Sequence, residues 1–138
     1  MHYHGYEWRG SDEERARHRA AGHIDSPGFR SSEVPPIKIC WWLRRPAHAV
    51  QGTWDAAADA VGWMAERYAG IEAALEDPAP FWAATAGRHG AAERDLSAGR
   101  DVSWGYRLRD GGRAFIVAVC CSPNGWEDLR CPLATDAG

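Results

Sequence analysis

The chain has 138 residues, of which 45% are hydrophobic and 25% are charged, and its formal net charge is −3. This length and composition are typical of one globular domain and exclude an intrinsically disordered chain. The small negative charge also excludes an overall basic field of the kind that attracts nucleic acid.

The N-terminal segment, starting His2-Tyr3-His4, has no basic region followed by an apolar run, so it does not resemble a signal peptide. No stretch approaches the roughly 18 apolar residues that a membrane span needs. We therefore expect a cytoplasmic protein that does not enter a membrane. Lys38 is the only lysine among 16 basic residues, which fits a GC-rich coding sequence and an actinobacterial or phage-like origin.

Residues 1–36 are expected to form an irregular N-terminal segment with one short helix. Ser11 and Glu14 form a capping box, which predicts a polar helix that begins there and continues to Ala21. Ser-Pro-Gly, Ser-Ser and Pro-Pro clusters between His23 and Pro36 then predict an ordered loop.

Large apolar side chains recur at every second position in residues 37–45, which predicts a strand that ends at Pro46. Trp41 and its alternate neighbours are assigned to the core face, and Trp42 and Arg44 to the other. Thr53 is expected to cap a long helix over about 53–75, because apolar residues recur there every three or four positions. A second, broken helix is expected over residues 81–98.

Residues 102–108 and 113–121 predict a β-hairpin, since Asp110-Gly111-Gly112 between them suits a tight turn. A two-residue turn at Asp110-Gly111 would place Trp104 opposite Val117 and Tyr106 opposite Phe115. The fold class is therefore α+β: a single domain (residues 1–138) with a small, mostly antiparallel sheet of three or four strands, including the 102–121 hairpin, packed against the 53–75 helix, with additional short helices.

The chain is tryptophan-rich, with eight of these residues, and tryptophan is favoured at interfaces as well as in cores. In the predicted register, the sheet face opposite the core has a floor of small residues from 114 to 120 with arginines at its rim. A broken helix, a ligand or a partner chain would fit over such a floor. The expected binding residues are Trp42, Arg44, Trp63, Arg107, Arg109 and Trp126.

The histidines and the four cysteines allow either metal binding or disulfide formation. His2 and His4 form a His-x-His pair that needs further ligands from elsewhere. Three cysteines with His48 would bind zinc only if folding brought Cys40 close, so no metal ligand and no cofactor are assigned. In an oxidising compartment Cys131 would pair with Cys120 or Cys121, whereas in the cytoplasm all four cysteines are expected to be reduced.

His89, in the glycine-rich break Gly87–Gly90, is the best single candidate for a catalytic residue, with Glu93 and Asp95 available to orient it. Cys120 or Cys121 is the alternative, as a nucleophile. No phosphate loop, nucleophile elbow or dinucleotide fingerprint is present, which counts against an enzyme of a common class.

The leading functional hypothesis is a non-enzymatic binding module, of an inhibitor, immunity or accessory type, that engages a protein partner or associates with itself. The first alternative is a small enzyme or ligand-binding protein with its site on the small-residue sheet face, near His89, Arg107 and Arg109. The second alternative is single-stranded nucleic-acid binding by the same face, since aromatic and arginine side chains stack on bases.

Overall fold

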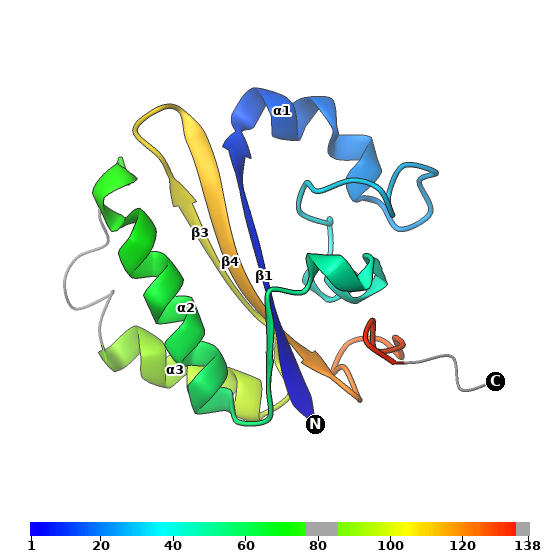
Figure 1. Cartoon of the computed structure of the whole chain (residues 1–138), viewed down its shortest axis with the longest axis vertical. Coiled ribbons are helices and arrows are strands. Elements are labelled where there is room, and N and C mark those ends of the chain that lie inside the picture. Colours follow the sequence, from blue (N-terminus) through cyan, green and yellow to red (C-terminus); the bar gives the residue numbers. More distant parts are fainter. Residues whose placement is uncertain (77–85, 135–138) are drawn as a thin grey trace.

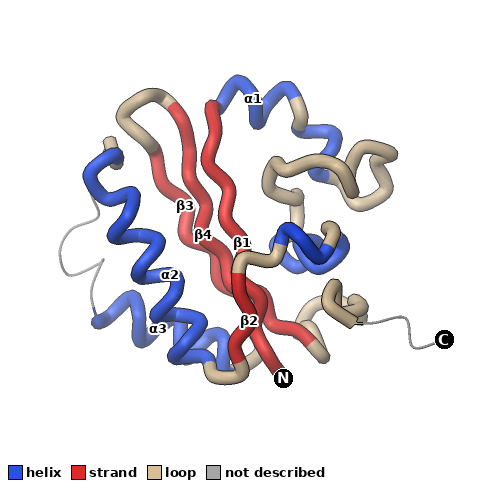
Figure 2. Tube along the Cα trace, viewed as in Figure 1, coloured by secondary structure: helices blue, strands red, loops and turns tan. Residues whose placement is uncertain are grey.

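The computed structural model describes residues 1–76 and 86–134. A four-stranded antiparallel sheet in the order β2-β1-β4-β3 runs through the middle of the molecule (Figures 1 and 2). The strands are β1 (His2–Ser11), β2 (Gly52–Trp54), β3 (Val102–Arg107) and β4 (Gly112–Cys121). The predicted α+β class and antiparallel sheet are confirmed.

The first strand, β1, is a correction to the sequence analysis, which expected irregular structure there. It pairs with β4 over its whole length, from His2 opposite Cys121 to Ser11 opposite Gly112. Side chains in a strand alternate between the two sheet faces, so the histidines and aromatic rings at even positions of β1 share one face. This alternation is the sequence signal for the strand. The capping prediction at its end is confirmed, because Ser11 accepts a hydrogen bond from the backbone N–H of Glu14.

The helix that begins there, α1 (Asp12–Arg17), is shorter than expected, and a 3-10 helix, η1 (Arg19–Gly22), follows it. The predicted strand over residues 37–45 is wrong. Residues Ile39–Arg44 form a 3-10 helix, η2, which lies across the sheet and buries Cys40, Trp42 and Leu43. Prolines before and after this segment are poorly suited to a central strand.

Two helices cover the first face of the sheet, α2 (Ala57–Ile71) and α3 (Ala86–Ser97) (Figure 1). The short 3-10 helix η4 (Glu72–Ala74) follows α2. The long helix was predicted, but not its start: Thr53 belongs to β2, and Ala56 occupies the N-cap position. Part of the second predicted helix, residues 81–85 with Trp82, lies outside the described residues.

The hairpin β3–β4 is confirmed, but its predicted register is wrong by one residue. Trp104 lies opposite Ile116 and Tyr106 opposite Ala114. Three residues, Arg109 to Gly111, connect the strands, and Gly111 has φ +85°, which is typical of a three-residue hairpin loop. A one-residue shift moves every partner to the other face, so Trp104 shares its face with the small residues Ala114 and Ala118.

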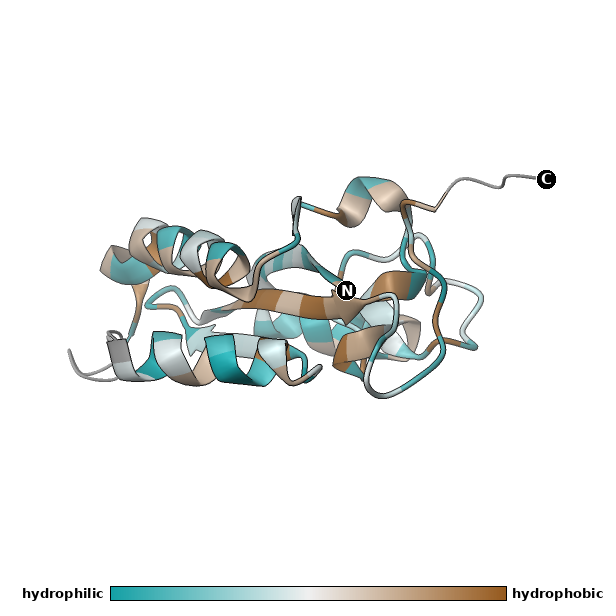
Figure 3. Ribbon diagram, turned by 90° about the horizontal axis from the view of Figure 1, so that it is seen from below, coloured by the Kyte–Doolittle hydropathy of each residue, from teal (hydrophilic) through white to brown (hydrophobic). Residues whose placement is uncertain are grey.

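The sheet therefore has a hydrophobic cluster on each side. On the first side, α2 and α3 pack against Trp104, Ile116 and their neighbours. On the second side, η2 and the C-terminal segment pack against Tyr6, Trp8 and Val119. Figure 3 shows hydrophobic residues along the strands between these layers. The small-residue face is thus covered by helices and is not open to a ligand.

Candidate metal centre

Four metal-binding side chains meet at one end of the sheet, on its second face. His2 lies directly opposite Cys121, and His4 lies two positions further along β1 on the same face. Cys131 reaches them from the C-terminal segment. The pairing of β1 with β4 thus brings together residues that lie more than 100 positions apart.

The potential ligand atoms of the four residues all lie within 4.8 Å of one another. His2 Nε2 lies 3.1 Å from His4 Nε2, and Cys131 Sγ lies 3.5 Å from the first and 3.4 Å from the second. Tetrahedral zinc with ordinary Zn–N and Zn–S bond lengths separates two nitrogens by about 3.3 Å and a nitrogen and a sulfur by about 3.6 Å. The three spacings among His2, His4 and Cys131 are close to these values, and Cys121 Sγ lies within 4.8 Å of the other three atoms. No other such group occurs in residues 1–76 and 86–134.

Thr53 of β2 holds the ring of His4. Its Oγ1 lies 2.8 Å from His4 Nδ1, across the strand pair in which the two residues are partners. In the tautomer with its proton on Nδ1, His4 donates a hydrogen bond to this hydroxyl. The lone pair of Nε2 is then free and is directed at His2 and Cys131. Metal-bound histidines commonly have their other ring nitrogen fixed by such a hydrogen bond.

Burial favours neutral side chains in this cluster. It lowers the pKa of His4 to about 4, with a smaller contribution from His2, and raises the pKa of Cys121 to about 11. His4 is therefore unprotonated at neutral pH. The Cys121 thiol would lose its proton at this pH only on binding a cation.

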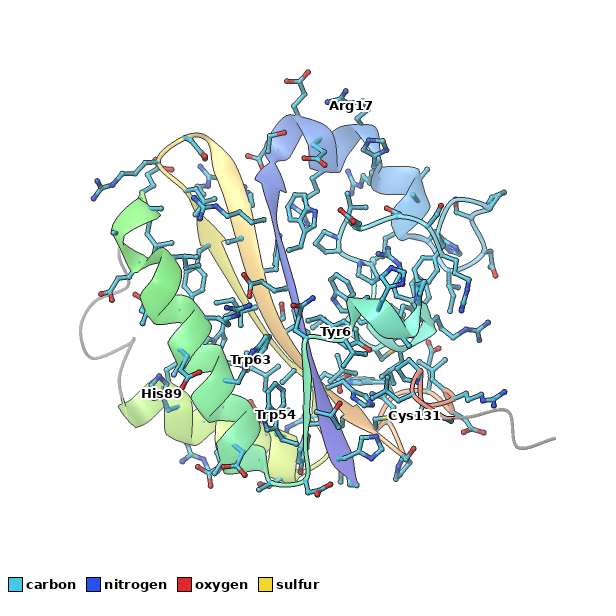
Figure 4. All side chains as sticks on the ribbon, in the orientation of Figure 1. Tyr6, Arg17, Trp54, Trp63, His89 and Cys131 are labelled. Atoms are coloured by element: carbon cyan, nitrogen blue, oxygen red, sulfur yellow. The ribbon has the colours of Figure 1, made fainter. Side chains whose placement is uncertain are left out.

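The hydroxyl of Tyr6 lies close to the two cysteines, and burial followed by the effect of Cys121 and Cys131 raises its pKa. Tyr6 is fully buried, stacks on Trp42 with 4.9 Å between ring centroids, and its hydroxyl has no hydrogen-bond partner among the described residues. Figure 4 shows Tyr6 and Cys131 on the same side of β1. A buried donor without an acceptor is costly, and a metal-bound thiolate would provide a strong acceptor.

From the sequence, His2 and His4 were expected to need ligands from elsewhere, and a separate zinc site of three cysteines with His48 was expected only if Cys40 came close. The two sets could not be joined because β1 was not predicted as a strand. In the structure Cys40 is a buried residue of η2 and His48 is exposed, and neither belongs to the cluster. All four cysteines are free thiols.

The six predicted binding residues do not form one surface. Trp42 is buried, so the expectation that it points outward is wrong. Trp63 is half-buried against Trp54, with 5.2 Å between ring centroids (Figure 4). Arg44, Arg107 and Arg109 are exposed, and the Nε of Arg109 donates to the carbonyl of Leu75. Trp126 is 69% exposed, the most exposed of the large hydrophobic residues described.

The predicted catalytic group is also not assembled. His89 is half-buried on α3, where its ring stacks on Trp104 with 5.9 Å between centroids. Arg107 lies at an odd position of β3, so its side chain is on the other face of the sheet from Trp104. Histidine and arginine therefore do not meet on a common small-residue floor.

No family model, no curated protein and no solved structure matches this chain. Among the described residues, no helix has both the length and the apolar character that crossing a membrane requires.

Proposed function

We propose that this protein binds one zinc ion per chain through His2, His4, Cys121 and Cys131. The observation that carries the proposal is the convergence of two imidazole nitrogens and two thiols within 4.8 Å of one another, with His2, His4 and Cys131 close to tetrahedral spacing. A donor set of two nitrogens and two sulfurs suits zinc better than it suits calcium or magnesium, which prefer oxygen.

The proposed role of the metal is structural. Four protein ligands complete a tetrahedral shell and leave no open position for a water or a substrate. The ion would join the C-terminal segment, through Cys131, to the start of β1 and the end of β4. Zinc bound in this way contributes directly to the free energy of folding.

We expect protein purified under reducing conditions to contain one zinc per chain by elemental analysis. Substituted cobalt should give the visible absorption bands of a tetrahedral site with thiolate ligands. Cys121→Ser, Cys131→Ser and His2→Gln should each lower zinc affinity by more than the roughly 10- to 100-fold that loss of a hydrogen-bond partner of a ligand costs. Thr53→Val removes such a partner and should fall within that range.

Cys120→Ala is the matched control. Cys120 is next to Cys121 but faces the helices on the other side of the sheet, so its loss should leave zinc affinity unchanged. A wild-type protein that binds no zinc when reduced, or an equal loss in Cys120→Ala and Cys121→Ser, would overturn the proposal. A Cys121–Cys131 disulfide that mass spectrometry still finds after purification with a reducing agent would also count against it.

A second candidate function is protein binding without catalysis, and the exposed apolar side chains near Trp126 favour it. Ile37 is 60% exposed and Ile39 is 37% exposed. The residue between them, Lys38, forms an ion pair with Glu127, which holds this segment beside Trp126. Exposed aromatic and aliphatic side chains on one surface are typical of protein interfaces.

A second copy of the same chain is the partner that we propose for this surface, because a two-fold dimer needs only one such patch on each chain. The molar mass measured by light scattering should increase with concentration for the wild type. It should stay at the monomer value for Trp126→Ser. Leu133→Ser, which changes another exposed apolar residue, is the control. A wild type that is monomeric at all concentrations would exclude self-association.

A further inference from the structure

A pocket of about 480 Å³ beside Cys131 is lined by four arginines and, among the described residues, by no acidic one. The arginines are Arg30, Arg44, Arg45 and Arg130. They come from the loop before residue 35, from the end of η2 and from the C-terminal segment, and the other lining residues are small or apolar. Such a concentration of positive charge is unusual in a chain whose net charge is −3.

Arg45 is the most unusual of the four, because it is only 2% exposed. Its guanidinium donates to the carbonyl oxygens of Ser32 and Val34, at 2.5 and 2.8 Å, and lies over the ring of Phe29. Its Nε has no hydrogen-bond partner, and no carboxylate of the described residues pairs with it. Burying a charge without a counter-charge is costly.

Arg30 and Arg44 form no ion pair within the described part of the chain, and Arg30 donates to the carbonyl oxygen of Arg44 at 3.3 Å. The pKa of Glu127 is lowered by its hydrogen bond to Lys38 and, to a smaller extent, by Arg44, but its carboxylate is already bound to Lys38 and to the indole N–H of Trp41. The charges of Arg30 and Arg44 therefore remain available to an anion.

We propose that this pocket binds a small molecule carrying a phosphate group. Arg30 and Arg44 would hold the phosphate oxygens, because the planar guanidinium presents paired N–H groups that match them. Buried Arg45 would add a fixed positive charge below the ligand. The volume falls within the range of about 300–1,000 Å³ that is usual for small-molecule sites. A multiply charged anion balances several arginines better than one carboxylate does.

A larger cavity next to it, about 780 Å³, does not support the same inference. It shares Arg30 and Arg45, but Glu7, Glu14 and Glu33 also line it, so its charges offset one another. The absence of acidic residues is what distinguishes the arginine pocket.

Glycerol 3-phosphate is a suitable probe, titrated by calorimetry at low salt with glycerol and citrate as neutral and carboxylate comparisons. We expect glycerol 3-phosphate to bind, glycerol not to bind, and citrate to bind more weakly. Arg30→Gln and Arg44→Gln should each weaken glycerol 3-phosphate binding about tenfold, because a charge-assisted hydrogen bond is lost. Affinity should also fall as salt is added.

Arg17→Gln is the matched control, since it removes an equal charge from an exposed arginine of α1 that lies far from Cys131 (Figure 4). The control should bind as the wild type does. His2→Gln tests whether phosphate binds the proposed zinc instead, because His2 belongs to the metal cluster and does not line the pocket, and binding should persist in this variant. The proposal is overturned if the wild type does not bind glycerol 3-phosphate at low salt, if Arg17→Gln loses as much affinity as Arg44→Gln, or if His2→Gln abolishes binding.

Discussion

At the scale of single residues, Asp101 is a partly buried carboxylate that links β4 to the turn after it. Its Oδ1 accepts hydrogen bonds from the backbone N–H of Cys120, at 2.8 Å, and from the side-chain amide of Asn124, at 3.1 Å. Burial raises the pKa of Asp101 above its ordinary value of 3.8, and these hydrogen bonds oppose the increase only in part. The charged form of this group is therefore less favourable in the folded protein than in the unfolded chain.

The direction of this pKa shift predicts a pH dependence of stability. A raised folded-state pKa contributes stability that is fully present below pH 3.8 and is lost as the pH rises through the folded-state pKa. Asp101→Asn keeps an acceptor oxygen and has no charge, so it lacks this loss. Its free energy of unfolding relative to the wild type should increase as the pH rises from 3.8 through the folded-state pKa of Asp101, as measured by urea titrations.

Asp128→Asn, at an exposed carboxylate, is the control for Asp101→Asn and should show no such change with pH. If Asp101→Asn loses stability relative to the wild type as the pH increases, the assigned effect of burial is wrong.

The tryptophans show which residue positions can be predicted from sequence. Trp104 was assigned to the core by strand periodicity and is buried there. Trp42 was assigned to the open face and is buried, because the element that carries it is a 3-10 helix. Trp8 lies in a segment without a predicted element, so periodicity gave no expectation for its burial, and it is buried in β1. Periodicity therefore predicts burial only where the type of element has been identified correctly.

At the scale of elements, the loop Arg109 to Gly111 determines which face of the sheet each residue of the hairpin occupies. Gly111 has φ +85°, and a Cβ at this position would contact nothing within 4 Å. Gly62, in the middle of α2, has equally open surroundings and an ordinary helical backbone. The two glycines differ in backbone conformation and not in the space around them.

Alanine at these two positions should therefore have opposite effects. Gly111→Ala is expected to lower the free energy of unfolding by about 1 kcal/mol, because a side chain disfavours positive φ. Gly62→Ala is expected to raise it by about 0.5–1 kcal/mol, because alanine is the better helix former. Chemical denaturation of both variants measures this, and a gain in stability for Gly111→Ala would show that the loop does not need its positive φ.

The register of the hairpin could not be read from the sequence, because Asp110-Gly111-Gly112 allows a loop of two or three residues. The apolar residues on both faces of β4 do not favour one register over the other, since Val117 and Ile116 are each buried. Only the helices on one side and η2 on the other decide which of them faces which layer.

At the scale of the whole molecule, the sheet is covered on both sides by very different layers. The first layer consists of α2 and α3, whose helical pattern the sequence shows clearly. The second layer is built from η2, loops and the C-terminal segment, which have no periodic pattern (Figures 1 and 2). The arginine pocket lies in this second layer, and the proposed metal centre lies where Cys131 of that layer meets β1 and β4. Because this layer has no periodic pattern, the sequence indicated only Arg44 among the pocket arginines and did not bring the metal-site residues together.

Local sequence patterns were enough to predict the α+β class, the capped helix after Ser11, the long amphipathic helix and the hairpin, because each depends on neighbours within a few residues. The pairing of β1 with β4, which places His2 and His4 beside Cys121, emerged only from the folded chain. Contacts between residues more than 100 positions apart depend on which strands pair and in which register. Local propensity does not contain that information.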